Sequence, residues 1–106
     1  MEIIHTRLFA KSLKKLGASK ADLTKLEAEI AANPEAGDVI PGLNGVRKIR
    51  FAMGGKGKRG GGRAIYLAVV SAETAYLLLA YAKSQKEDLT EDDKKVLREL
   101  ATILKT

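Results

Sequence analysis

Apolar residues in the first third of the chain predict a strand followed by two helices. Residues 2–9 are typical of a short strand, and residues 11–16 begin a helix that stops at the following glycine. A second helix is expected to start at an N-cap, Ser19, with Asp22 in its first turn, and to end at the Asn-Pro pair 33–34. Its apolar face carries three residues at helical spacing: Leu23, Leu26 and Ile30.

The middle of the chain predicts three strands that pair as an antiparallel meander. After an irregular connection at 37–45, alternation along 46–53 puts apolar side chains on one face and the bases Lys48 and Arg50 on the other. A glycine-rich loop at 54–62 follows. Strands 63–71 and 75–82 are joined by only three residues, so we expect them to be antiparallel neighbours. Their nearly continuous apolar character places them at the centre of the sheet, covered by helices.

The last element is an amphipathic helix that begins at an N-cap motif formed by Thr90 and Asp93. The element order β-α-α-β-β-β-α predicts an α+β fold, a small antiparallel sheet with helices packed on it. With 106 residues, the chain is expected to form one domain over 1–106. The apolar stripe of the last helix consists of Val96, Leu97, Leu100, Ile103 and Leu104.

Positive charge is concentrated in one segment. The chain has a net charge of +6, yet no acid occurs between Val39 and Ala72, and the rest of the chain is close to neutral. Such a concentration favours a surface that binds a polyanion. The seven bases in this segment are Arg47, Lys48, Arg50, Lys56, Lys58, Arg59 and Arg63.

Composition excludes several kinds of site. The absence of cysteine excludes disulfides, thiolate zinc sites and cysteine nucleophiles, and it suits a reducing cytoplasm. The single histidine, His5, argues against a histidine metal site or an acid/base pair of histidines. Acids at 87–93 surround a helix start, where they stabilise the helix, so we expect no metal. No apolar run is long enough to span a membrane, and we expect no membrane partner.

The glycine-rich loop and the end of the last strand are the candidate functional segments. The loop lacks the Lys-Ser or Lys-Thr and the following helix of a Walker A motif, which excludes an NTPase. Lys48, Arg50 and Arg63 flank the loop from two strands and are expected to converge on one positive patch that favours nucleic-acid backbones. Tyr81 and Lys83 share a strand face and point to base stacking, proton transfer or phosphate contact.

Several blocks of sequence together resemble the HigB-like branch of the RelE toxin superfamily. They are GDVIPGLNGVRKIR at 37–50, GKGKRGGGRAIY at 55–66, YLLLAYAK at 76–83 and DLT at 88–90. The resemblance implies a small antiparallel sheet with helices on one side. It also implies a ribosome-dependent mRNA endoribonuclease, the toxin of a type II toxin–antitoxin pair. Its partners would be mRNA, the ribosome and a HigA-like antitoxin with a helix-turn-helix domain, and we expect the free toxin to be a monomer.

The family mechanism is attack of the mRNA 2′-hydroxyl on the adjacent phosphate, with no metal or cofactor. By resemblance, Arg63 contacts the scissile phosphate, and Lys48 and Arg50 are the basic strand residues that face the active site. Tyr81 and Lys83 match the Tyr-x-Lys that ends the last strand of this branch. The residues expected to bind mRNA or ribosomal RNA are Arg47, Lys56, Lys58, Arg59 and Tyr66.

The chain departs from the RelE pattern after Lys83. Ser84 stands where RelE carries an arginine, and Leu89 and Thr90 stand where a tyrosine is expected. The general base is therefore open among Tyr81, Lys48 and Lys83. Two other functions share these features: inhibition of DNA gyrase, as in the ParE branch, and RNA or ribosome binding without catalysis.

Overall fold

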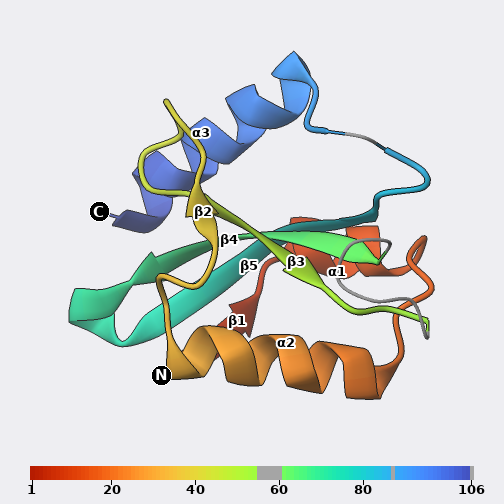
Figure 1. Ribbon diagram of the computed structural model, residues 1–106. Coiled ribbons are helices and arrows are strands. Elements are labelled where there is room, and N and C mark those ends of the chain that lie inside the picture. Colours follow the sequence, from red (N-terminus) through yellow and green to blue (C-terminus); the bar gives the residue numbers. More distant parts are fainter. Residues whose placement is uncertain (55–60, 87, 106) are drawn as a thin grey trace.

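The computed structural model describes residues 1–54, 61–86 and 88–105, and within them five strands form one sheet with the order β1-β5-β4-β3-β2 (Figure 1). The strands are β1 (Glu2–His5), β2 (Asp38–Val39), β3 (Arg47–Phe51), β4 (Gly62–Val69) and β5 (Thr74–Ala82). The helices are α1 (Arg7–Leu13), α2 (Lys20–Ala32), α3 (Glu91–Lys105) and a short 3-10 helix, η1 (Val70–Ala72). The predicted α+β fold is confirmed, with two-residue β2 added inside the expected irregular connection.

The sheet is mixed. The predicted antiparallel meander β3-β4-β5 is confirmed, and β2 pairs antiparallel with β3. β1, however, pairs in parallel with β5, with Glu2 opposite Thr74. The prediction of an antiparallel sheet is therefore confirmed for four strands and wrong for β1. β4 and β5 each have a neighbouring strand on both edges, as predicted from their apolar sequences.

The first helix begins earlier than predicted. β1 ends at His5, and Leu8 and Phe9, expected in the strand, lie in α1. The cause is Thr6, whose hydroxyl accepts a hydrogen bond from the Phe9 N–H and donates one to the Leu77 carbonyl. This N-cap starts the helix and attaches it to β5. The other two predicted caps are confirmed, because Ser19 with Asp22 and Thr90 with Asp93 form reciprocal bonds at the starts of α2 and α3.

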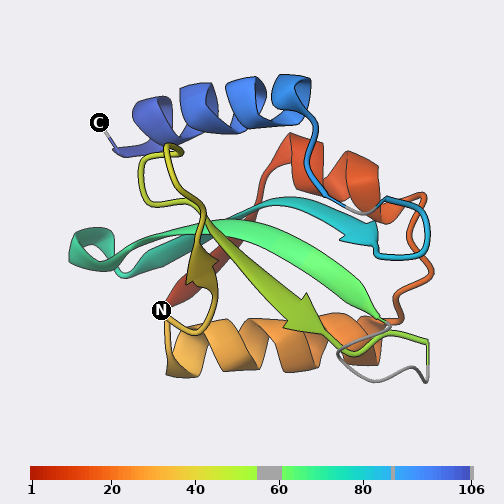
Figure 2. The ribbon, with the colours of Figure 1, turned by 45° about the horizontal axis from the view of Figure 1, so that its top comes forward.

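Helices cover both faces of the sheet (Figure 2). Phe9 of α1 and Leu26 and Ile30 of α2 belong to the core on one face, whereas Leu97 and Ala101 of α3 belong to the core on the other. The expectation of helices on one side is therefore wrong for α3. The apolar stripe of α3 is also narrower than predicted, because Val96 and Ile103 are 44% and 67% exposed.

A β-bulge in β5 changes the faces of its residues. The register shifts between Ile65 and Tyr66 of β4, and the neighbouring Leu78 and Leu79 both pack with the core under α3. Leu77 before the bulge lies in the opposite core. Tyr81 consequently lies on the α3 side of the sheet, the face that carries Arg63.

Candidate nucleic-acid interface

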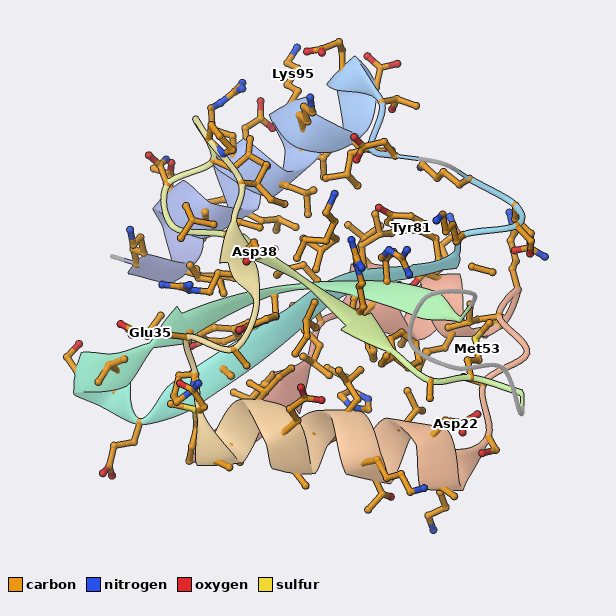
Figure 3. All side chains as sticks on the ribbon, in the orientation of Figure 1. Asp22, Glu35, Asp38, Met53, Tyr81 and Lys95 are labelled. Carbon is orange, nitrogen blue, oxygen red and sulfur yellow. The ribbon has the colours of Figure 1, made fainter. Side chains whose placement is uncertain are left out.

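Four basic side chains meet in one hollow of about 680 Å³, which we call the cationic hollow. Lys48 and Arg50 come from β3, Arg63 from β4, and Lys83 from the turn that follows β5. The sequence prediction that basic residues from several elements converge is confirmed. Two acids, Glu29 and Asp38, also line the hollow, and Asp38 lies on β2 in Figure 3.

Strand pairing sets the order of side chains across this site. Arg50, Arg63 and Tyr81 lie opposite one another on β3, β4 and β5. Residues opposite each other across paired strands point to the same face. Two arginines and a tyrosine thus form one row, and the Lys83 N–H donates to the Gly61 carbonyl, which holds the turn beside β4.

Arg63 is largely buried, with 6% of its surface exposed. Its Nη1 donates to the Gly62 carbonyl at 3.1 Å. Gly62 lies against the Phe51 ring, and an added Cβ would come within 2.5 Å of a ring carbon. The aromatic ring over a glycine fixes the backbone immediately before Arg63, so its guanidinium is oriented before any ligand binds.

Tyr81 lies at the end of β5 on the side of the sheet covered by α3 (Figure 3). It is 7% exposed, and its hydroxyl is buried without a hydrogen-bond partner in the described residues. Burial raises the pKa of Tyr81, the charge of Asp88 raises it further, and Arg63 acts in the opposite direction. The side chain is therefore a neutral hydrogen-bond donor near neutral pH, which argues against its use as a general base.

Lys48 forms an ion pair with Asp88, whose Oδ1 lies 3.6 Å from the Lys48 ammonium nitrogen. The pKa of Asp88 is lowered, first by a hydrogen bond from the Leu89 N–H and then by Lys48. Sequence reasoning treated Asp88 only as part of a helix start. The 39 residues between Lys48 and Asp88 do not predict this pair, because the contact forms only when the chain after β5 returns to β3.

Two residues expected to bind RNA have structural roles. Tyr66 is fully buried; its hydroxyl accepts from the Gly37 N–H at 2.9 Å and donates to the Pro34 carbonyl at 2.8 Å. The Arg47 guanidinium donates to the Gly37 carbonyl at 2.7 Å and more weakly to that of Glu35. Tyr66 has no exposed surface in this structure, and Arg47 holds the connection before β2. Strand alternation could have predicted these structural roles, because Arg47 and Tyr66 lie on the sheet face opposite to that of Lys48.

The expected basic loop residues Lys56, Lys58 and Arg59 lie outside the described residues. The described start of that loop is held by Asp22, near Met53 in Figure 3, whose carboxylate accepts from the N–H groups of Ser19 and Gly54. These two bonds lower the pKa of Asp22. In residues 1–54, 61–86 and 88–105 no group of histidines and acids is arranged to hold a metal ion, and His5 pairs with Glu27 at 3.5 Å.

Among the described helices, none combines the length and the apolar character needed to cross a membrane.

Comparison with known proteins identifies relatives of this fold. The family of RelE toxins of RelE/RelB toxin–antitoxin systems matches residues 1–106. The isolated E. coli RelE toxin superposes with a TM-score of 0.59 at 17% identity, covering 93% of this chain and 97% of that chain. A chain of the intact E. coli RelBE toxin–antitoxin complex superposes with a TM-score of 0.56 at 19% identity, covering 76% and 94%. At these identities the solved structures show a common fold.

Proposed function

Because this chain belongs to the family of RelE toxins of toxin–antitoxin systems, we propose that it is a ribosome-dependent endoribonuclease that cuts mRNA during translation. The observation that carries the proposal is the cationic hollow, where four bases from strands β3 and β4 and from the turn after β5 face one space. A phosphodiester backbone is the polyanion that such a site complements. We propose accordingly that the protein acts in the cytoplasm, where translating ribosomes are found.

The proposed reaction needs only groups that this chain and its RNA carry. The mRNA 2′-oxygen attacks the adjacent phosphorus, the bond from phosphorus to the 5′-oxygen breaks, and a 2′,3′-cyclic phosphate and a 5′-hydroxyl result. One proton leaves the 2′-hydroxyl and one reaches the departing 5′-oxygen, so the step is balanced without oxidation or reduction. The protein's task is to align these atoms and to stabilise charge on the pentacoordinate phosphorus.

Arg63 is the residue that we assign to the developing charge. Its guanidinium offers several donors in a planar arrangement and is held by the Gly62 carbonyl in a largely buried position. Donors fixed before the reaction cost no reorganisation when charge develops. Lys48, Arg50 and Lys83 line the same hollow. Arg50 is proposed to hold a flanking phosphate, together with whichever of the two lysines does not take the 2′-hydroxyl proton.

Tyr81 is proposed to donate a hydrogen bond to the substrate rather than to accept a proton. Its raised pKa keeps the hydroxyl protonated, and a substrate oxygen seated at Arg63 would supply the partner that the hydroxyl lacks in the described residues. Removal of the 2′-hydroxyl proton is left to Lys48 or Lys83.

We assign the chain an antitoxin partner, in line with its family and with the E. coli RelBE complex that shares its fold. The HigB-like sequence blocks support an antitoxin of the HigA-like helix-turn-helix type. Co-expression with the neighbouring gene and purification through a tag on one chain tests whether the two proteins form a complex.

Induction of wild type, Arg63→Lys and Arg63→Ala in cells, followed by mapping of mRNA 5′ ends, tests the activity. We expect cuts inside translated codons that disappear when the start codon of a message is removed. Loss of the oriented guanidinium should reduce cleavage by roughly 10²–10³-fold. Arg7→Ala is the matched control, because this exposed arginine on α1 does not line the cationic hollow.

Folding of each variant is verified by thermal unfolding and by retained antitoxin binding. Growth arrest with intact mRNA would overturn the proposal and favour a target such as DNA gyrase. Salt-sensitive RNA binding without cleavage on translating ribosomes would also overturn the proposal and would indicate that the protein binds RNA without cutting it.

A further inference from the structure

A second hollow lies on the other side of Tyr81, between α1 and the end of β5. We call it the lysine hollow, because Lys11, Lys15 and Lys86 are the charged residues among the described residues that line it. Its volume is about 380 Å³, within the range of ~300–1,000 Å³ of small-ligand sites. Its apolar lining includes Leu8, Leu16 and Leu79.

Helical spacing on α1 creates one wall of this hollow. Leu8, Lys11 and Lys15 follow one another at intervals of three and four residues, which places them on one helix face. α1 ends at Leu13, but the Lys15 N–H donates to the Ser12 carbonyl, so a tight turn continues the face. Lys86 is paired with Asp93, whereas Lys11 and Lys15 form no ion pair with any described residue.

One strand pairing links the lining of the lysine hollow to that of the cationic hollow. Tyr81 lines the lysine hollow and lies directly opposite Arg63, which lines the cationic hollow. The turn that begins with Lys83 leads to Gln85 and Lys86 on the rim of the lysine hollow. The path from a phosphate at Arg63 to the lysine hollow therefore passes Tyr81.

We infer that the lysine hollow receives one unpaired nucleobase next to the scissile phosphate, with the phosphates that flank it held by Lys11 and Lys15. This inference rests on the proposed function and adds a site that would influence which codons are cut. The flat face of a nucleobase packs against the leucine lining, and the phosphates on either side complement lysines that no acid neutralises within the described residues.

The edge of β5 disfavours an extended peptide as the occupant. The Ala80 N–H, which an added strand would need, donates to the Ser12 hydroxyl at 3.0 Å, and that hydroxyl donates to the Phe9 carbonyl. This backbone donor at the back of the hollow is thus already satisfied. A base that packs against leucines makes no demand on it.

The test uses the full chain labelled at leucine and isoleucine methyl groups, titrated with a single-stranded tetraribonucleotide that is 2′-O-methylated to prevent cleavage. We expect shifts at Leu8 and Leu79 in the lysine hollow together with shifts at Ile49 in the cationic hollow. Leu8→Trp, which fills the lysine hollow, should abolish the Leu79 shift and leave the Ile49 shift.

Salt dependence gives a second readout. Lys11→Gln/Lys15→Gln should lower the slope of log affinity against log salt by about 1.4, the value for two contacts to single-stranded phosphates. Lys14→Gln/Lys20→Gln changes the same charge on exposed lysines that do not line the hollow, and its slope should match wild type.

Shifts at Ile49 alone would overturn the inference and leave the proposed endoribonuclease intact. Shifts at Leu8 and Leu79 with a Glu/Leu-rich peptide and none with RNA would also overturn it and make the hollow a protein-docking site. If the leucine shifts occur with RNA but mRNA in cells stays uncut, the subsite holds and the proposed catalytic function fails.

Discussion

Arg63 of β4 lies directly opposite Arg50 of β3, so two like charges face each other across a pair of strands. Like charges in this position lower the stability of a sheet. Strand pairs elsewhere in the described sheet oppose mainly apolar or mixed side chains. The proposed function gives a reason for this pairing, because a phosphate bound by both arginines would offset their repulsion.

Arg50→Gln is expected to stabilise the free protein while it weakens RNA cleavage. Removal of one of two opposed charges should raise the free energy of unfolding by roughly 0.2–1 kcal/mol. Urea denaturation at low and high salt measures the change, and the gain should shrink at high salt, where the repulsion is screened. A loss of stability at low salt would show that the arginine pair is not repulsive.

Tyr66→Phe is expected to destabilise the fold by about 1–3 kcal/mol, because it leaves the buried Gly37 N–H without its partner. Chemical denaturation measures the loss. Tyr76→Phe is the control, since the half-buried Tyr76 hydroxyl forms no hydrogen bond with the described residues. Equal effects of the two substitutions would contradict the assigned role of Tyr66.

Gly62→Ala is expected to cost ~1–3 kcal/mol, because the added methyl group would overlap the Phe51 ring and force the two strands to shift. The same shift would move Arg63, so cleavage should fall more than the change in stability alone requires. Gly17→Ala serves as the control, as no atom lies within 4 Å of its added Cβ. Thermal unfolding and the cleavage assay together separate the two effects.

Asp88→Asn is expected to lower stability at neutral pH and to have no effect in strong acid. The pKa of Asp88 is lowered in the folded protein by the Leu89 N–H and by Lys48, so its carboxylate favours folding at pH values above the unfolded-state pKa of about 3.9. This contribution is lost as the pH falls through the lowered pKa. Unfolding curves of both proteins from pH 7 to pH 2 should converge at the acid end. A constant difference across that range would exclude titration of Asp88 as the cause.

Local signals accounted for most of the secondary structure. Ser19 with Asp22 and Thr90 with Asp93 marked two helix starts because an N-cap depends on residues only three apart. The N-cap at Thr6 was missed, since the apolar Leu8 and Phe9 fit a strand as well as a helix. Attachment of Thr6 to Leu77 decides between them, and that contact joins distant parts of the chain.

The sequence by itself determined the fold class, the antiparallel meander and the grouping of the basic side chains Lys48, Arg50 and Arg63, because strand alternation and charge clustering are local properties. Lys83 was expected on a strand face with Tyr81, but it lies in the turn after β5. Tertiary structure alone decided the parallel pairing of β1, the position of α3 on the second face, the pair of Lys48 and Asp88, and the burial of Tyr66. A bulge at one position of β5 turned Tyr81 toward Arg63. Such features depend on which distant segments pack together, and no periodicity along the chain records that choice.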